Sequence, residues 1–317
     1  MYEEILRKFL PESISKLMRD MNKAVVINEI HLRVSKPVIL LSANEEYAFS
    51  QSGALTKDII NGLTVTREDL NNTIQRISGY SLYAWEDELK NGFITLQGGH
   101  RAGICGKVVV ENESIKTISH ISSVCIRLAH EVKGCSDEVF NMLAENGLGH
   151  TVIISPPGCG KTTFLRDLIR NISNGEKGNF NGLTVGLADE RQEIAGSYMG
   201  MAQNDVGIRT DILDRCPKHK GMLMLLRSMS PKVIAADEIG SAEDINTIGD
   251  IMGAGVKVIC TVHGRDIDDI RKKQRNLSPL IEDRLFDNYI VISAKNGPGT
   301  IEGAYDRDFK KVKIYGS

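Results

Sequence analysis

The spacing of apolar residues changes near residue 133, and this change divides the chain into two regions. In the first, apolar residues recur at helical spacings over residues 3–22, with Pro11 interrupting the run. The polar face of this stretch mixes acidic and basic residues, so we expect it to pack on its own domain rather than on a membrane. Short apolar runs then predict strands, with one helix among them at about residues 66–78. These runs are VVINEIHLRV, PVILL, FITLQ and ICGKVVV.

The second region alternates apolar, β-rich runs with helical patterns. Strands are expected at TVIIS, LTVGLAD, VIAAD, VKVICTV and YIVIS, and helices at SDEVFNMLAEN, from Lys161 and around residues 244–252. The segment NGEKGNFNG at 174–182 is expected to be a surface loop. Because such alternation is typical of a parallel sheet covered on both faces, the chain is predicted to be α/β. We expect a smaller α+β domain over residues 1–133 and a parallel-rich domain over residues 134–317.

The segment SPPGCGKTT at 155–163 matches the phosphate-binding P-loop at every position but the first. The pattern is G-x-x-x-x-G-K-[ST], and Ser155 stands where the first glycine is usual. A predicted strand precedes the segment and a predicted helix follows it, which is the context that the motif needs. Glycine-rich backbone N–H groups and a helix N-terminus both favour phosphate. The residues expected to bind ATP are Pro157, Gly158, Cys159, Gly160, Lys161, Thr162 and Thr163.

Hydrolysis of ATP needs Mg²⁺ and acidic residues beside the P-loop, and two acidic clusters follow predicted strands. The run VIAADE ends in Asp237 and Glu238, the form of a Walker B motif. We expect Thr162 and Asp237 to hold Mg²⁺, and Glu238 to polarise the attacking water. The preceding strand ends in a second cluster that contains Glu190. Glu190 competes with Glu238 for the role of catalytic base, and the residues alone do not rank the two.

Two further side chains are candidates for the same site. His263 follows an apolar strand and is expected at the sheet edge where ligands of open α/β sheets bind. A structural role and a role in sensing the γ-phosphate both stay open for it. Arg209 is a candidate for stabilising charge in the transition state, although arginines of this kind more often form surface ion pairs.

Composition excludes some classes of protein. The chain has 317 residues with 39 basic and 41 acidic side chains, so its formal charge of −2 argues against an extended nucleic-acid surface. Six cysteines lack CxxC spacing, which predicts buried, unpaired thiols in a reducing cytosol. No signal peptide and no run long enough to span a bilayer is expected.

Taken in order, the motifs resemble the stage III sporulation protein AA family, which belongs with the type II/type IV secretion ATPases. The resemblance covers nearly the whole chain. It is carried by GYSLYAWEDELKNGFITLQGGHRAGICGK, SPPGCGKTT, LADERQEIAG, GIRTDILDRCPK, LRSMSPKVIAADEIG and AGVKVICTVHG.

The resemblance implies a RecA-like P-loop ATPase domain preceded by a smaller α+β domain, assembled as a homo-hexamer. The acidic box of that superfamily matches Asp189–Glu193, and its histidine box matches Thr261–Gly264, which favours a catalytic role for His263. Arg101 and Arg127 match arginines that reach the nucleotide. The implied role is to energise a channel at the mother-cell face during endospore formation. The protein would be cytoplasmic and held at the membrane by a partner in that complex.

Two other functions stay open beside a secretion-type motor. A RecA-like, nucleic-acid-dependent ATPase is one of them, although we expect no appended nucleic-acid-binding domain because the chain ends at Ser317, soon after AYDRDF. A nucleotide-gated scaffold that binds ATP without turnover is the other. The acids and the histidine argue against the scaffold, because binding alone does not need them.

Overall fold

A computed structural model describes most of the chain as two compact units. The first unit holds residues 1–130 with residues 198–203, and the second holds residues 131–197 and 204–317. The boundary expected after residue 133 stays a prediction. The structure describes residues 2–19, 25–42, 45–79, 92–111, 113–176, 180–273 and 277–314. Part of the motif GYSLYAWEDELKNGF lies outside these ranges.

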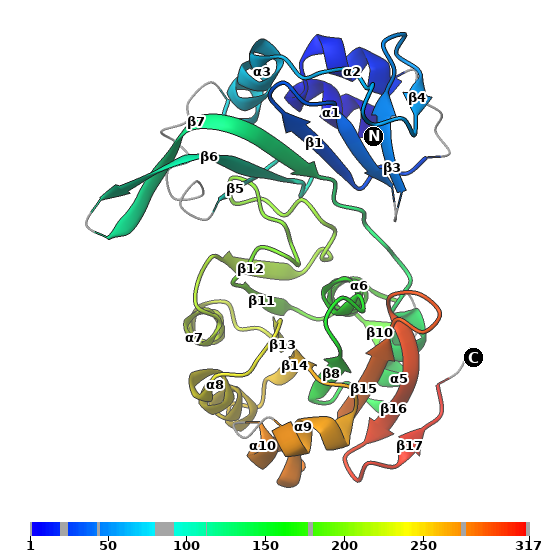
Figure 1. The fold of residues 1–317 in the computed structure, drawn as a ribbon. Coiled ribbons are helices and arrows are strands. Elements are labelled where there is room, and N and C mark those ends of the chain that lie inside the picture. The colour runs from blue at the N-terminus through cyan, green and yellow to red at the C-terminus, as the bar shows by residue number, and fades with distance from the viewer. Residues whose placement is uncertain are drawn as a thin grey trace. The chain divides into compact units, whose positions relative to one another are not determined.

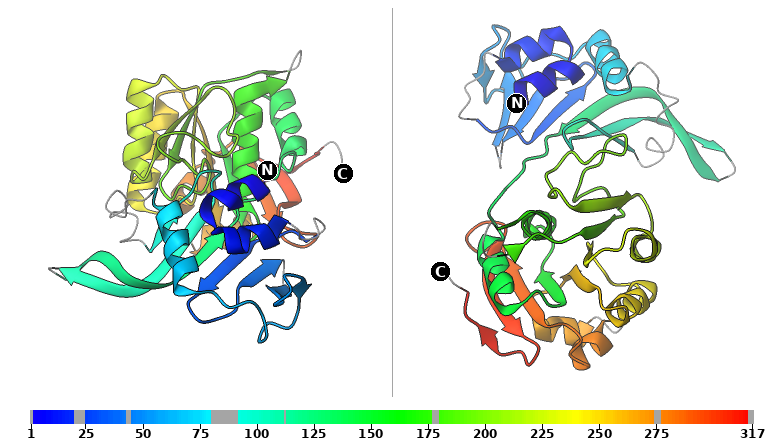
Figure 2. Two further views of the ribbon diagram at one scale, coloured as in Figure 1. Left: turned by 90° about the horizontal axis from the view of Figure 1, so that it is seen from above. Right: turned by 180° about the vertical axis from the view of Figure 1, so that it is seen from behind.

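The first unit is an antiparallel sheet with helices packed on one face (Figures 1 and 2). Its strand order is β4-β3-β2-β1-β7-β6-β5. Alternate residues of each strand face the helices, and a single hydrophobic core fills the space between the two layers. The strands are β1 Glu29–Arg33, β2 Ile39–Ser42, β3 Glu45–Phe49, β4 Leu55–Thr56, β5 Phe93–Thr95, β6 Arg101–Glu111 and β7 Ser114–Arg127. The helices are α1 Tyr2–Phe9, α2 Glu12–Arg19 and α3 Arg67–Ile77.

Two of the expected helical segments of this unit form as their sequences predict. The described part of the stretch expected at residues 3–22 forms α1 and α2, and Pro11 lies between them. The third helix begins after Thr66, whose hydroxyl accepts a hydrogen bond from the backbone N–H of Asp69 while the Asp69 carboxylate accepts from the backbone of Thr66. This capping box satisfies two N–H groups that the helix itself leaves unpaired.

The second unit is a mostly parallel sheet between two layers of helices. Its strand order is β12-β11-β13-β14-β8-β15-β16-β17, in which β15, β16 and β17 form antiparallel pairs. The helices are α5 Asp137–Asn146, α6 Lys161–Asn174, α7 Lys218–Ser228, α8 Ala242–Gly253, α9 Ile267–Lys273 and α10 Ser278–Glu282. The strands are β8 Thr151–Ser155, β9 Gly175–Glu176, β10 Phe180–Asn181, β11 Val185–Asp189, β12 Thr210–Asp214, β13 Val233–Ala236, β14 Lys257–His263, β15 Asn288–Ser293, β16 Thr300–Asp306 and β17 Lys311–Val312.

The central strands of this sheet are buried on both faces because helices cover both sides. Ile153 of β8 belongs to the core beneath α5 and α6, whereas its neighbours Val152 and Ile154 belong to the core beneath α7 and α8. Figure 1 shows the two pairs of helices on opposite sides of the sheet. Each such buried side chain contributes roughly 1.5–3 kcal/mol. The α/β fold with a parallel-rich sheet, preceded by a smaller α+β unit, is thereby confirmed.

Two expectations about local structure are corrected. The segment 174–182 was expected to be a loop, but its ends form the short antiparallel pair of β9 and β10. Phe180 stabilises this pair by packing edge-to-face on Phe140 of α5, with ring centroids 5.4 Å apart. All six cysteines are unpaired, as expected, but only Cys159 and Cys260 are buried. Cys105 is exposed because strand alternation turns it away from the core, which its neighbour Ile104 enters.

None of the helices in the described part of the chain combines the length and the hydropathy that a membrane crossing requires.

Candidate functional site

The expected site residues follow neighbouring parallel strands that end at one edge of the second unit's sheet. The strands β11, β13, β14 and β8 lie in that order, and every adjacent pair is parallel. Ser155 at the end of β8 is in register with His263 at the end of β14. Asp237 and Glu238 directly follow β13, the next strand along. The P-loop, the histidine and the Walker B acids therefore reach the same edge.

The P-loop turns back on itself through glycines with positive φ. Gly158 has φ 74° and Gly160 has φ 83°, a region that L side chains rarely enter. Ser155 is the fully buried last residue of β8 and is not among the residues with positive φ, so a serine is accommodated in place of the usual glycine. The Cys159 carbonyl accepts a hydrogen bond of 2.8 Å from the N–H of Gly299, in the turn between β15 and β16. That later turn holds the loop's backbone in place.

Lys161, the first residue of α6, has a nearly buried side chain that points at the other candidates. Its Nζ lies 3.0 Å from Nδ1 of His263 and 3.4 Å from Oε1 of Glu238. The side chain is only 6% exposed. A buried ammonium costs several kcal/mol unless it is paired, and here two groups pair with it.

Thr162 and Asp237 form the second contact across the edge. The Thr162 hydroxyl donates a hydrogen bond of 2.8 Å to Oδ2 of Asp237. The hydroxyl of Thr261, on β14, donates to Oδ1 of the same carboxylate. The Thr162 hydroxyl and the Asp237 carboxylate are oxygen groups of the kind that a hard divalent cation prefers, so these two residues fit Mg²⁺.

Glu238 occupies a strained backbone position that its neighbours impose. Its φ is 50°, and its N–H donates to Oγ1 of Thr261 at 2.8 Å. Its carboxylate lies 2.9 Å from Nε2 of His263 and 2.5 Å from Nη1 of Arg191. Burial raises the pKa of Glu238, but the charges of Lys161, Arg191 and His263 lower it by more. Strain of this kind is typical of functional sites, and the carboxylate is held ionised.

Glu190 lines the same small hollow as Glu238. Its carboxylate pairs with Nζ of Lys218 at 3.1 Å, and the same ammonium donates to the carbonyl oxygen of Glu238 at 2.9 Å. Lys218 thus joins the two candidate bases. The hollow between these loops measures about 10 Å³, near the minimum for one water molecule. Asp189 and Asp237 also line it.

Within the acidic segment 189–193, Asp189 is buried and holds the loop together, whereas Glu190 is exposed. Asp189 is 2% exposed, and its carboxylate accepts hydrogen bonds from the backbone N–H groups of Glu193, Ile194 and Ala195. Burial raises the pKa of Asp189, and the three N–H donors only partly offset this. Arg166 of α6 holds the same loop by donating to the carbonyls of Glu193 and Ile194, both at 2.6 Å. Asp189 therefore shapes the loop that carries Glu190.

Arg209 is not brought to the P-loop of its own chain. Its guanidinium donates to the carbonyls of Ser173 and Asn174 at 2.8 and 3.3 Å, at the C-terminal end of α6. The P-loop lies at the other end of this helix, about 20 Å away for 14 residues. Within one subunit Arg209 caps a helix.

Arg101 and Arg127 lie together in the first unit. They are register partners on β6 and β7. Arg127 pairs with Glu29 at 3.0 Å, and the guanidinium of Arg101 lies 5.0 Å from the ring centre of Phe93.

Sequence reasoning missed three residues that organise the site: Lys218, Arg166 and Gly299. Two of them carried weak signals. Lys218 stands directly after Pro217 at the start of a helix, and Gly299 belongs to a Gly-Pro-Gly turn. Arg166 carried none, because a charged residue on an amphipathic helix is normally expected on its solvent face.

Solved structures and a curated relative resemble this chain. The Legionella pneumophila ATPase DotB has a TM-score of 0.55 at 16% identity, with 89% of this chain and 76% of that chain covered. The pilus retraction motor PilT, solved with bound ADP, also has a TM-score of 0.55 at 16% identity, with 87% and 76% covered. Stage III sporulation protein AA of Bacillus subtilis is 39% identical over 96% of this chain and 95% of its own length.

The fold and the P-loop edge together define a class, that of proteins with the fold of the ATPase DotB and the pilus retraction motor PilT. Within this class, the family described as sporulation stage III, protein AA matches residues 2–312. The chain belongs to that family.

Proposed function

We propose that this chain is a Mg²⁺-dependent ATPase that energises a secretion-like channel complex in endospore formation. The observation that carries the proposal is the convergence of Lys161, Thr162, Asp237 and Glu238 at one sheet edge. The membership in a sporulation family supports the biological setting, and the bound ADP of PilT supports a nucleotide as the ligand.

Each side chain has a role that its contacts support. Lys161 and the P-loop N–H groups bind the β- and γ-phosphates, so the ammonium exchanges Glu238 and His263 for phosphate oxygens. Thr162 and Asp237 hold Mg²⁺, which neutralises phosphate charge when it is bound. His263, released from Lys161, would contact the γ-phosphate.

Of the two candidate bases, Glu238 is better supported than Glu190. Its carboxylate lies 3.4 Å from the ammonium that would bind the γ-phosphate, and its backbone is fixed through Thr261. The Glu190 side chain is 38% exposed and forms an ion pair with Lys218. We therefore assign Glu238 to hold and polarise the attacking water, and Glu190 to orient Lys218.

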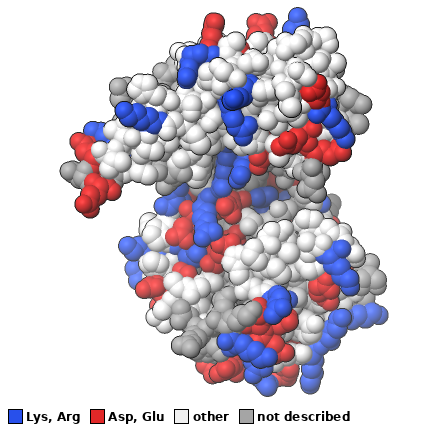
Figure 3. Space-filling model, in the orientation of Figure 1, with Lys and Arg blue, Asp and Glu red and all other residues white. Residues whose placement is uncertain are grey.

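The proposal includes a homo-hexamer in the cytoplasm, attached to the membrane through a channel protein. Arg101 and Arg127 would reach the nucleotide from the first unit, from the same subunit or from a neighbour. Nucleic acid is not proposed as a partner, since acidic and basic side chains are intermixed among the described residues on the face shown in Figure 3. Molar mass in solution with and without ATP tests the assembly, and a monomer under both conditions would contradict it.

Steady-state phosphate release and equilibrium nucleotide binding test the site. Glu238→Gln should lower kcat by about 10²- to 10⁴-fold while the protein still binds ATP. Glu190→Gln should lower it less, and Glu243→Gln, which alters an exposed acid on α8, should leave it unchanged. Lys161→Ala should abolish turnover and weaken binding. Full binding and turnover in Lys161→Ala would show that the site is misassigned.

A further inference from the structure

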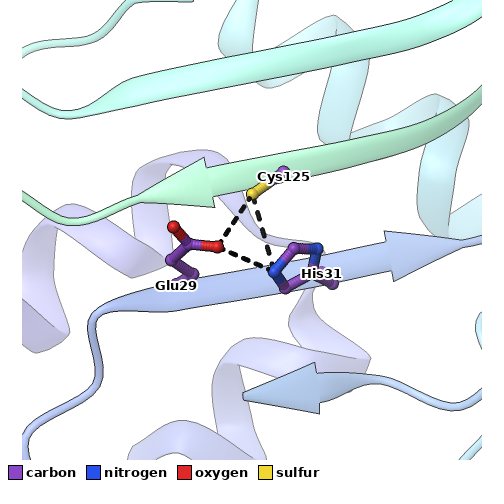
Figure 4. Close-up of side chains that lie close together, drawn as sticks. All are labelled: Glu29, His31 and Cys125. Carbon is purple, nitrogen blue, oxygen red and sulfur yellow. Dashed lines mark hydrogen bonds and ion pairs between the residues drawn. The ribbon is translucent and has the colours of Figure 1, made fainter. Parts of the chain in front are cut away.

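A second cluster of reactive side chains lies in the first unit, on the sheet face turned away from its helices. Glu29 and His31 are alternate residues of β1, and Cys125 is the register partner of His31 on β7. Their buried neighbours Ile30, on β1, and Ile126 face the core. The pairing of β1 with β7 therefore brings three different ligand-type groups to one face, as Figure 4 shows.

The three donor atoms converge on one point. Oε2 of Glu29 lies 2.9 Å from Nε2 of His31, and Sγ of Cys125 lies 3.7 Å from Oε2 and 3.8 Å from Nε2. A tetrahedral Zn²⁺ with ordinary bond lengths separates such atoms by roughly 3.4–3.6 Å. The sulfur distances already match within about 0.2 Å, and the Glu29–His31 pair opens by about half an ångström once a metal replaces the proton between them.

We propose that Glu29, His31 and Cys125 form a Zn²⁺ site with three protein ligands and a position left for solvent. A thiolate, an imidazole and a carboxylate together suit Zn²⁺ better than Mg²⁺ or Ca²⁺, which prefer oxygen ligands alone. The side chains of His31 and Glu29 are 18% and 25% exposed, so an ion can reach them. The site uses no P-loop residue, and its one link to the function proposed above is the ion pair of Arg127 with Glu29.

The surrounding groups support a metal rather than a nucleophile. In a nucleophilic triad the base contacts the nucleophile through one ring nitrogen and its orienting acid through the other. Here Cys125 and Glu29 both contact Nε2 of His31.

Two arginines affect the site in opposite ways. Arg127 holds the other carboxylate oxygen of Glu29 at 3.0 Å and orients it as a ligand. Arg33 lies 3.0 Å from Nδ1 of His31; because a guanidinium only donates, Nδ1 accepts and the proton sits on Nε2. Metal binding would release the proton of the Cys125 thiol and move the proton of His31 from Nε2 to Nδ1. Because a protonated Nδ1 no longer accepts a hydrogen bond, the exposed Arg33 would move away.

Zinc titration of the full chain in excess Mg²⁺, against a chromophoric chelator, tests the site. We expect one zinc per chain. Cys125→Ser should weaken binding by more than the roughly 10- to 100-fold that losing an outer partner costs. Cys105→Ser, which alters the exposed cysteine of the neighbouring strand, should bind as the parent does. Arg33→Gln should bind more tightly, because it removes a competing donor and a positive charge.

A measurement on the unaltered chain guards against a variant that fails to fold. Zinc should protect Cys125 from alkylation, as read by peptide mass, and leave Cys105 reactive. Cobalt in place of zinc should give a sulfur-to-metal charge-transfer band. Binding that persists in folded Cys125→Ser, or alkylation of Cys125 that zinc does not slow, would overturn the proposal.

Discussion

Lys218 joins the two loops that carry Glu190 and Glu238, so replacing it should affect both stability and turnover. Lys218→Met keeps most of the side-chain length but removes the ammonium. The lost hydrogen bond to the Glu238 carbonyl is charge-assisted and costs about 1.5–3 kcal/mol. The ion pair with the partly exposed Glu190 adds about 0–1 kcal/mol. We therefore expect a loss of about 2 kcal/mol in the stability of the second unit.

For a unit of this size, that loss lowers the melting temperature by about 4–8 °C. Because the Glu238 backbone at φ 50° loses a restraint, kcat should also fall, by about 10- to 100-fold. Calorimetry and phosphate release measure the two effects, with Lys220→Met, an exposed lysine of the same helix, as the control. If Lys218→Met behaves like that control in both assays, the contacts of Lys218 with Glu190 and with the Glu238 carbonyl do not stabilise the site.

Two further predictions concern the parts of the fold away from the P-loop. His100 is buried in the first unit, and this burial, together with the nearby His130, lowers the pKa of His100 to about 4. The unfolded chain therefore binds a proton at this residue below about pH 6.5, whereas the folded chain does not. Stability is therefore full above pH 6.5 and falls by about 2 kcal/mol at pH 5, a loss that urea unfolding should show and that should largely vanish in His100→Gln. Gly182→Ala would place a Cβ 2.4 Å from the carbonyl oxygen of Ser173 and should cost about 2 kcal/mol or more, whereas Gly253→Ala meets no atom within 4 Å. Equal melting temperatures for the two alanine variants would contradict this reading of the packing.

The strands at the centre of the second unit's sheet were predictable because helices cover both of their faces. Runs such as TVIIS and VIAAD carry apolar residues at consecutive positions instead of alternate ones, and they form β8 and β13, whose residues are all buried. By contrast, β12 was missed because it lies at the edge of the sheet, where TDILD is only partly buried. The long strand β7 was missed because its alternation is interrupted where the register with β6 shifts, between Cys105 and Lys107 and again at Val109.

At the candidate site, the sequence identified side chains that follow strands but not the contacts between them. Parallel pairing made it predictable that Lys161, Asp237 and His263 would share an edge. Nothing in the spacing indicated that Asp189 would turn inward to bind three N–H groups, since that depends on how the following loop folds back. The placement of Arg209 at the far end of α6 depends likewise on the packing of a distant loop.

The hydrogen bond between Gly299 and Cys159 has a consequence for folding during synthesis, because the chain is made from its N-terminus. Strand β8 and its loop leave the ribosome about 140 residues before the turn that braces them, and β15, one of the two neighbours of β8, also comes late. Until then β8 exposes an unpaired edge, a hazard for aggregation. Nascent chains that end after β14 should therefore bind nucleotide poorly and associate with one another, although the complete P-loop sequence has already been translated.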